Sequence, residues 1–170
     1  MGIDPVDKRL WADFLVIARP KVDWSLVGRV LCLDPGETTG WAIFNEGLLA
    51  ECGQWDTGRD PASLSDAIHA VNAAHALSHL VYETYRIRGN KAQEHVGSEV
   101  VTIQHIGAIK VAASWLGIEP AGQSAGMAKG FATDTKLRRW GLYQSNLRHA
   151  NDSIRHGCYW HLFVAGRQQP

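Results

Sequence analysis

The spacing of apolar positions divides this chain into short strands and amphipathic helices. Apolar, partly aromatic runs predict strands at 29–34, 40–45 and 48–56, and the Asn-Glu-Gly sequence at 45–47 supplies a turn between the last two. The three runs follow one another with short connections, which suit antiparallel neighbours. The pattern therefore predicts a three-strand antiparallel meander.

Helical spacing begins after this meander. Asp60 followed by Pro61 indicates a helix start, because Asp caps a first turn and proline fits the first helical position. The apolar residues that follow recur at steps of three and four, as in an amphipathic helix. The later segments predict a strand at 79–83, a helix at about 94–116, a short strand near 118–123 and a final helix from Ser145 or Asn146 to Phe163.

This order of elements predicts an α/β fold with a mixed five-stranded sheet, in which the antiparallel meander is joined by parallel strands and flanked by helices. The main domain should span residues 29–170. Residues 1–28 precede it as an N-terminal extension packed on the domain. Its expected helix ends at Pro20 and carries the apolar residues Leu10, Phe14, Leu15 and Ile17.

Length and composition fit one domain, since 170 residues with 45% hydrophobic content can bury one sizeable core. No apolar run approaches the roughly 20 residues that span a bilayer, and no signal-peptide pattern is present, so we expect a soluble cytoplasmic protein without a membrane partner. Cys32, Cys52 and Cys158 are odd in number and lie in apolar sequence. They are expected to be reduced thiols in the core.

Three acidic residues stand at the ends or beginnings of predicted elements. Asp34 ends the first strand in an Asp-Pro-Gly turn, Glu83 ends the fourth strand, and Asp152 lies in the early turns of the last helix. An Asp-Pro-Gly turn alone is common without any chemistry, but together the three acids predict one shared site. His149 and His156 lie on the same helix face as Asp152, and we expect His149 rather than His156 to serve that site.

With these residues in view, the chain resembles the RuvC-type Holliday junction resolvases of the RNase H-like nuclease superfamily, particularly their phage-encoded branch. The resemblance covers roughly residues 29–163 and rests on the D-P-G...T-G turn, the Glu that ends the fourth strand and the acid in the last helix. Members carry Asp or His three residues before that last acid, where this chain has His149. The basic stretch 126–143 also looks like the segment before the final helix in phage members. One departure is a turn, from Asp34 to Gly40, that is one residue shorter than the bacterial form.

The resemblance implies an RNase H-like fold and a structure-selective endonuclease that resolves four-way DNA junctions, in the host-cell cytoplasm if the chain is phage-encoded. Asp34, Glu83 and Asp152 fall on the metal-binding positions, and His149 would complete the metal shell or move a proton. Two Mg²⁺ or Mn²⁺ ions about 4 Å apart would activate water and offset transition-state charge.

A four-way junction has approximate two-fold symmetry, so paired nicking predicts a homodimer. We expect the helix at 94–116 to form the shared surface, where Gly97 and Gly107 permit close approach. The apolar stripe on this helix consists of Val96, Val100, Ile103 and Ile106 or Gly107.

The charge distribution fits a nucleic-acid partner, although the net charge is zero. Residues 1–83 carry 6 basic and 12 acidic side chains, whereas residues 84–170 carry 11 basic and 5 acidic ones. Solvated helix faces produce the same kind of run, so this alternative stays open. The candidate DNA-binding residues are Arg86, Arg88, Lys91, Lys129, Lys136, Arg138, Arg139, Arg148 and Arg155.

Aromatic residues near Glu83 add one more candidate. Strand alternation sends Tyr82 into the core and leaves Tyr85 near the surface. The resemblance implies an aromatic residue shortly after the Glu that stacks on an unpaired junction base, which makes Tyr85 the candidate. Trp115, Trp140 and Trp160 are expected in the core.

Three other functions remain open. The chain could be an RNase H-like nuclease that acts on flaps or RNA, because the acids do not choose the substrate. It could bind branched DNA without cutting, although intact acids at all three positions disfavour this. The residues Asp34 to Thr38 also fit the phosphate loop of actin-like ATPases and sugar kinases, but those proteins need two copies of the fold, so no nucleotide cofactor is expected.

Overall fold

The computed structural model describes residues 9–85 and 96–165 of the chain. The predicted alternation of strands and helices is present, and the basic stretch after the last strand forms two short helices that the apolar pattern did not indicate. The elements are α1 Arg9–Ala18, the 3-10 helix η1 Trp24–Leu26, β1 Arg29–Asp34, β2 Thr38–Asn45, β3 Leu48–Asp56, α2 Pro61–His75, β4 His79–Thr84, α3 Val96–Trp115, β5 Ala121–Ser124, α4 Ala125–Phe131, α5 Asp134–Arg139 and α6 Arg148–Phe163.

The five strands form one mixed sheet in the order β3-β2-β1-β4-β5. β1 pairs antiparallel with β2, and β2 pairs antiparallel with β3, which confirms the predicted meander. β4 runs parallel to β1, and β5 runs parallel to β4. The predicted α/β fold with a mixed five-stranded sheet is therefore confirmed.

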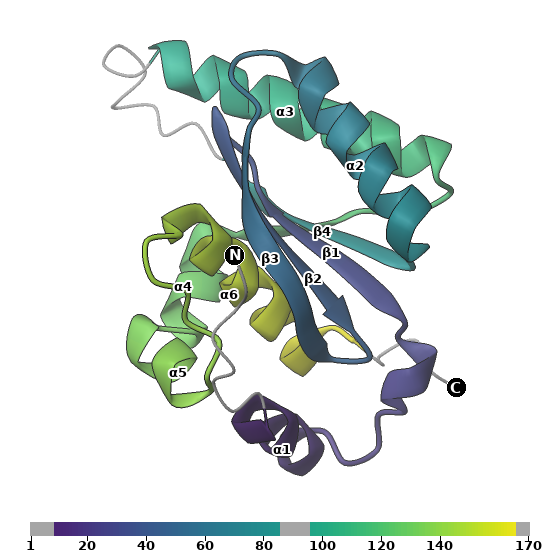
Figure 1. The fold of residues 1–170 in the computed structure, drawn as a ribbon, viewed down its shortest axis with the longest axis vertical. Helices are drawn as coiled ribbons and strands as arrows, with labels where there is room; N and C mark the ends of the chain where they lie inside the picture. The colour runs from purple at the N-terminus through teal and green to yellow at the C-terminus, as the bar shows by residue number, and fades with distance from the viewer. Residues whose placement is uncertain (1–8, 86–95, 166–170) are drawn as a thin grey trace.

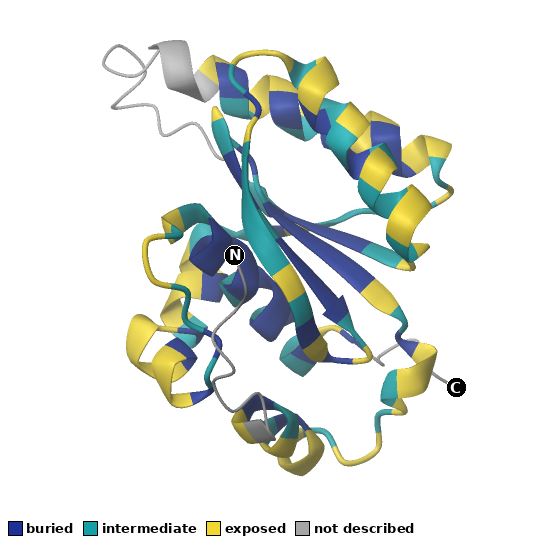
Figure 2. Ribbon diagram, viewed as in Figure 1, coloured by how far each residue is buried: buried dark blue, intermediate teal, exposed yellow. Residues whose placement is uncertain are grey.

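Helices cover both faces of the sheet, with α2 and α3 on one side and α4, α5 and α6 on the other (Figure 1). Alternate residues of β1 serve the two sides. Val30 and Cys32 pack in a cluster with residues of α1, α5 and α6, whereas Leu31 and Leu33 pack with α2 and α3. All four are fully buried, as in a central strand covered on both faces. Figure 2 shows this buried band along the central strands.

The last helix, α6, begins at Arg148, slightly later than the predicted start at Ser145 or Asn146. Asn146 has a positive φ of 63°, which is outside the helical region. The side chain of Asn151 then bonds both the N–H and the carbonyl of Gln144, at 2.9 and 2.7 Å. These bonds give the preceding loop a fixed, non-helical path into α6.

Two glycines allow α6 to lie directly against the sheet. A Cβ added to Gly40 of β2 would lie 2.0 Å from the carbonyl oxygen of His149, in the first turn of α6. A Cβ added to Gly157 of α6 would lie 2.1 Å from the ring of Phe44 in β2. Any side chain at either position would push the helix away from the sheet. The absence of side chains at Gly40 and Gly157 thus permits the short distance between α6 and the sheet.

α1 connects the β2–β3 turn with the far end of α6. Trp11 is fully buried and donates its indole N–H to the carbonyl of Gly47, at 2.8 Å. The guanidinium of Arg19 donates to the carbonyls of Leu162 and Ala165, at the end of α6 and just beyond it. The N-terminal helix therefore fixes the last turn of α6.

Three apolar side chains expected to pack inside are exposed. Leu10 and Ile17 of α1 are 49% and 79% exposed, because the buried anchor of that helix is Trp11. Trp115 was predicted in the core, yet it is 78% exposed at the end of α3. The spacing of apolar residues identified these helices but not which apolar side chains face the sheet.

Among the described residues, no helix combines the length and the apolar character needed to cross a membrane. Cys32 and Cys158 are buried, Cys52 is partly buried, and all three are free thiols, as expected. Burial raises the pKa of the Cys32 and Cys158 thiols, which keeps both protonated.

The seating of α6 predicts that Gly40→Ala destabilises the protein, because the new methyl group meets backbone atoms that cannot rotate away. The expected loss is about 1–3 kcal/mol in the free energy of unfolding, measured by urea denaturation. Gly126→Ala in α4 is the matched control, since a Cβ there meets nothing within 4 Å. Equal midpoints for G40A and the unmodified protein would contradict the close approach.

Candidate active site

Asp34, Glu83 and Asp152 approach one another from three elements. β4 runs parallel to β1 with Leu33 opposite Tyr82, so the next residues, Asp34 and Glu83, follow side by side at the carboxyl ends of their strands. Asp152 lies in the second turn of α6, which packs on both strands. The charges of Glu83 and Asp152 both act on Asp34. The three acids singled out from the sequence therefore share one site.

Asp34 is paired with His149. Nδ1 of the imidazole lies 2.9 Å from Oδ2 of Asp34. Burial raises the pKa of the Asp34 carboxyl, and the two neighbouring carboxylates add to that rise, while the hydrogen bond with His149 partly opposes it. In return, the bond to Asp34 raises the pKa of the His149 imidazole. The pair therefore holds a proton beside the strand end.

Backbone and turn contacts fix the surroundings of this pair. The backbone N–H of His149 donates to Oε1 of Gln54 on β3, at 2.9 Å, which anchors the first turn of α6 on the sheet. In the turn after Asp34, the hydroxyl of Thr39 donates to the carbonyl of Gly36 and lies 3.0 Å from the hydroxyl of Thr57. These hydroxyl contacts close the loop beside Asp34.

His156 belongs to the site, although the sequence interpretation favoured His149 alone. It is fully buried, and its Nε2 lies 3.0 Å from Oε2 of Glu83. Its Nδ1 lies 3.0 Å from Oε1 of Gln123 on β5, a residue that the sequence interpretation missed. Burial alone would raise the pKa of Glu83, but the His156 hydrogen bond and a nearby lysine ammonium bring that pKa below its ordinary value. The i, i+4 spacing from Asp152 was the available signal for His156.

Arg155 faces the acids instead of the solvent. Its side chain is 11% exposed, and its guanidinium bonds the carboxylates of Asp152 and Asp134. Its Nε also donates to the carbonyl of Ala132 at 3.0 Å, between α4 and α5. Arg155 therefore holds Asp152 in place, and its role in DNA binding stays a prediction.

Lys129, on α4, lies between two of the acids. Its Nζ is 3.2 Å from Oδ2 of Asp152 and 3.8 Å from Oε2 of Glu83. The side chain is 46% exposed, so the ammonium reaches the acids from the solvent side. This residue was expected among the DNA contacts, and the structure places it at the acid cluster itself.

The other described basic candidates lie on α5 and at the start of α6. Arg139 and Arg148 are exposed. Lys136 donates from its ammonium to a backbone carbonyl of α4, at 2.6 Å. The guanidinium of Arg138 lies over the ring of Tyr143, 3.6 Å from its centre. These side chains surround the entrance to α6 without contacting the three acids.

The aromatic residues that flank Glu83 divide as the strand pattern predicts. Tyr82 is buried on the α2–α3 side, and Tyr85 is 36% exposed just beyond β4. The remaining DNA-binding candidates, which are Arg86, Arg88 and Lys91, lie outside the described residues.

The donor set suits a hard divalent cation, because three carboxylates supply the oxygen ligands that Mg²⁺ and Mn²⁺ prefer. Within residues 9–85 and 96–165, no group of three or more His, Cys, Asp or Glu side chains is arranged to hold a metal as it stands. Each acid is turned towards a basic partner instead. Since the Lys129 side chain is partly exposed, it can withdraw and free carboxylate oxygens. The residues therefore fit such a metal in their chemistry, and Lys129 would have to move before the carboxylates could bind it.

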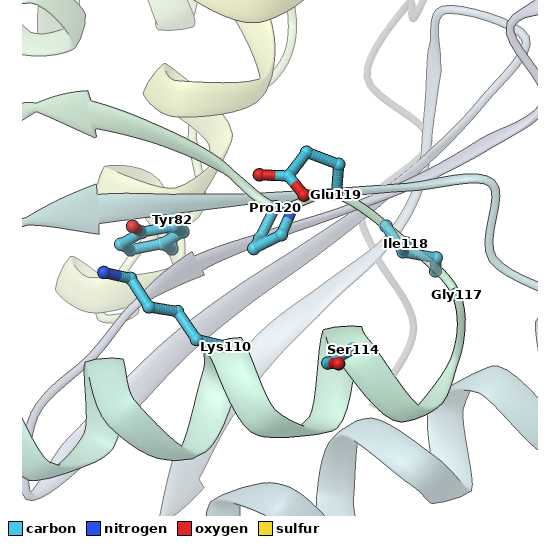
Figure 3. Close-up of a pocket in the computed structure, with 7 residues that line it drawn as sticks. All are labelled: Tyr82, Lys110, Ser114, Gly117, Ile118, Glu119 and Pro120. Atoms are coloured by element: carbon cyan, nitrogen blue, oxygen red, sulfur yellow. The ribbon is translucent and has the colours of Figure 1, made fainter.

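Two hollows border this region differently. Figure 3 shows a cavity of about 620 Å³ between α3 and the edge of the sheet, with Tyr82 and Lys110 among its lining residues. It opens on the sheet face opposite Glu83, because neighbouring strand residues point to opposite faces. A smaller hollow of about 180 Å³ includes Arg155, the partner of Asp152, but none of the three acids lines it. Its lining residues are Asp134, Tyr143, Asn146, Arg148, Asn151 and Arg155.

Comparison by sequence gave no result: no family model matches the chain, and no curated protein does. Comparison by structure gave several. RuvC of T. thermophilus in complex with a Holliday junction substrate aligns with a TM-score of 0.66 at 12% identity, over 80% of this chain and 94% of that one. A second structure of Thermus thermophilus RuvC aligns with a TM-score of 0.62 at 14% identity, over 79% and 94% of the two chains.

The yeast mitochondrial Holliday junction resolvase Ydc2 aligns over 89% of this chain and 84% of its own, with a TM-score of 0.53 and 10% identity. The TM-scores establish a shared architecture. The sequence identities are too low to show a shared activity, which must be argued from the site. The chain therefore has the RNase H-like fold of the RuvC-type Holliday junction resolvases.

Proposed function

We propose that this protein is a structure-selective DNA endonuclease that resolves four-way junctions by metal-dependent hydrolysis of phosphodiester bonds, acting as a homodimer. Its main support is the meeting of Asp34, Glu83 and Asp152 at the carboxyl ends of β1 and β4, beside α6. The bacterial RuvC with the same fold has been observed with a Holliday junction substrate. The fold thus favours a junction as substrate, and the three acids favour metal-dependent hydrolysis.

The acids would hold two Mg²⁺ or Mn²⁺ ions, which supply an activated water and offset negative charge in the transition state. Asp34, which lies beside Glu83 and is influenced by both other acids, would be one of the ligands. His156 directs the carboxylate of Glu83, and the guanidinium of Arg155 directs that of Asp152. His149 keeps a proton beside Asp34, where it can be given to a leaving oxygen.

Exposed cations near the acids would hold the DNA backbone. Arg139 on α5 and Arg148 at the start of α6 are free to contact phosphates, and Arg148 lines the small hollow beside Asp152. Tyr85, at the end of β4, would stack on an unpaired base at the junction centre. Stacking tolerates any base, so it suits recognition of a branched shape rather than of a sequence.

The outward face of α3 supports the homodimer. Its exposed residues are mostly apolar or small, and the charged one among them, Lys110, lies with Ser114 at the edge that borders the cavity beside Tyr82. A Cβ added to Gly107 would meet nothing within 4 Å, so a second helix can approach closely there. An exposed apolar face of this kind favours association, and a second copy matches the two-fold symmetry of the substrate. The exposed residues are Val100, Ile103, Gln104, Gly107, Lys110, Val111, Ser114 and Trp115.

The deciding experiment uses a synthetic immobile four-way junction and a linear duplex of matched sequence, each with Mg²⁺, Mn²⁺ or EDTA. Symmetric, metal-dependent nicks confined to the junction are the expected result. Junction binding without nicks would instead favour a non-cleaving branched-DNA-binding protein. Indifference to the junction would favour an RNase H-like nuclease for flaps or RNA, which the same assay can test with those substrates.

Neutralising any one acid should abolish cleavage, because each of the three is a proposed metal ligand. Asp34→Asn, Glu83→Gln and Asp152→Asn are each expected to lower the cleavage rate by about 10³-fold or more while the affinity for the junction changes little. Rates from single-turnover cleavage and affinities from gel shift in Ca²⁺ provide the comparison. Cleavage that survives in all three variants would reject the assigned site.

The Asp34–His149 pair predicts a histidine with a raised pKa in the metal-free protein. The imidazole should remain protonated at a pH above its ordinary value of 6.5, and Asp34→Asn should lower its pKa. Because the folded-state pKa is the higher one, stability from this pair is complete below the unfolded-state pKa and is lost as the pH rises through the folded-state pKa. Histidine resonances followed by NMR measure this, with buried His161, whose pKa burial lowers to about 4, as the internal control.

A charge on the outward face of α3 should separate the proposed dimer. Val111 is 52% exposed, so Val111→Glu is expected to weaken association by about tenfold or more without unfolding the chain. Sedimentation velocity over a concentration series gives the dissociation constant. Val16→Glu on α1 is the control, because Val16 is also exposed and lies on another helix. If the unmodified protein sediments as a monomer at every concentration, the proposed paired nicking loses its basis.

A further inference from the structure

Four basic side chains contact the three acids, and they differ greatly in exposure. His156 is fully buried and Arg155 is 11% exposed, whereas His149 and Lys129 are 33% and 46% exposed. Buried partners cannot leave without exposing an uncompensated charge to a poorly solvated site. Partly exposed partners can exchange their contact for water at small cost. Lys129 and His149 are therefore the displaceable members of the cluster.

Lys129 differs from His149 because it joins two acids that come from different elements. Its one ammonium lies 3.2 Å from Asp152 on α6 and 3.8 Å from Glu83 on β4. Both carboxylates would be metal ligands in the proposed function. An ammonium and a divalent cation need the same oxygens and repel each other at short range. Both cannot occupy this position together.

We propose that Lys129 is a built-in counter-ion that holds Glu83 and Asp152 while no metal is bound and that competes with the divalent cation for them. The inference rests on the proposed function, because it takes these acids as metal ligands. Metal binding then requires the ammonium to withdraw towards solvent, which lowers the apparent metal affinity of the free protein. The withdrawn ammonium would then lie on the solvent side of the acids, which is the side open to a DNA phosphate.

The test measures Mn²⁺ binding to the metal-free full-length protein from the EPR signal of free Mn²⁺, without DNA and without any activity assay. Lys129→Met is expected to bind Mn²⁺ about tenfold more tightly than the unmodified protein, the order expected when one partly exposed competitor is removed. Lys129→Arg keeps the charge and should restore weak binding. Thermal denaturation of each variant verifies that it is folded.

Lys136→Met is the matched control, because it removes the same charge from the neighbouring helix α5, where the ammonium bonds a backbone carbonyl instead of the acids. Its Mn²⁺ affinity should stay within about threefold of the unmodified protein, as screening of a separated charge predicts. Equal affinities for K129M and K136M, or weaker binding by K129M, would overturn the role of Lys129.

Glu83→Gln separates this inference from the proposed function. Mn²⁺ binding that is lost in E83Q but unchanged in K129M would leave the metal site standing and reject the counter-ion. Mn²⁺ binding that is indifferent to E83Q, or absent altogether, would reject the metal site and the counter-ion together. Tighter binding by K129M that disappears in the double variant with E83Q is the result that supports both.

Discussion

The close approach of α6 to β2 is the constraint on which the candidate site depends. Gly40 and Gly157 leave no space for a side chain between helix and sheet, and this alone sets the distance between them. His149, Asp152 and His156 lie on the same face of α6. A wider separation would remove all three from the strand-end acids at once. Two residues without side chains thus determine the geometry of the residues whose side chains would act.

Grouped carboxylates in a partly buried position repel one another, and the fold meets this cost with a basic neighbour for each acid. Burial divides these neighbours into two kinds. His156 and Arg155 are enclosed and orient their carboxylates permanently, whereas His149 and Lys129 are open to solvent and can change partners. The same arrangement offsets the repulsion among the acids and, in the proposed function, would leave the site able to accept a metal ion.

Much of this could be predicted from local sequence. Asp34 and Glu83 end apolar runs, and the carboxyl ends of parallel neighbours such as β1 and β4 lie at the same edge of the sheet, so their proximity follows once that pairing is expected. The inward direction of Arg155 and the importance of His156 could not be predicted, because they depend on how α6 is rotated about its axis on the sheet. α4 and α5 are too short to give a periodic signal. The apolar spacing of α3 was visible, but which of its faces meets the sheet was not.

The contacts that build the site join distant parts of the chain, and this affects when the site can exist. Asp34 is separated from His149 by 115 positions, and Arg19 from Leu162 by 143. At a synthesis rate of about 5–20 residues per second, roughly 6–23 s pass between the appearance of Asp34 and that of its partner. Until α6 docks, Asp34 and the segment with Arg19 lack the contacts that they make in the folded protein. If the proposed nuclease function holds, a nascent chain without α6 would lack the assembled site and would be harmless to DNA.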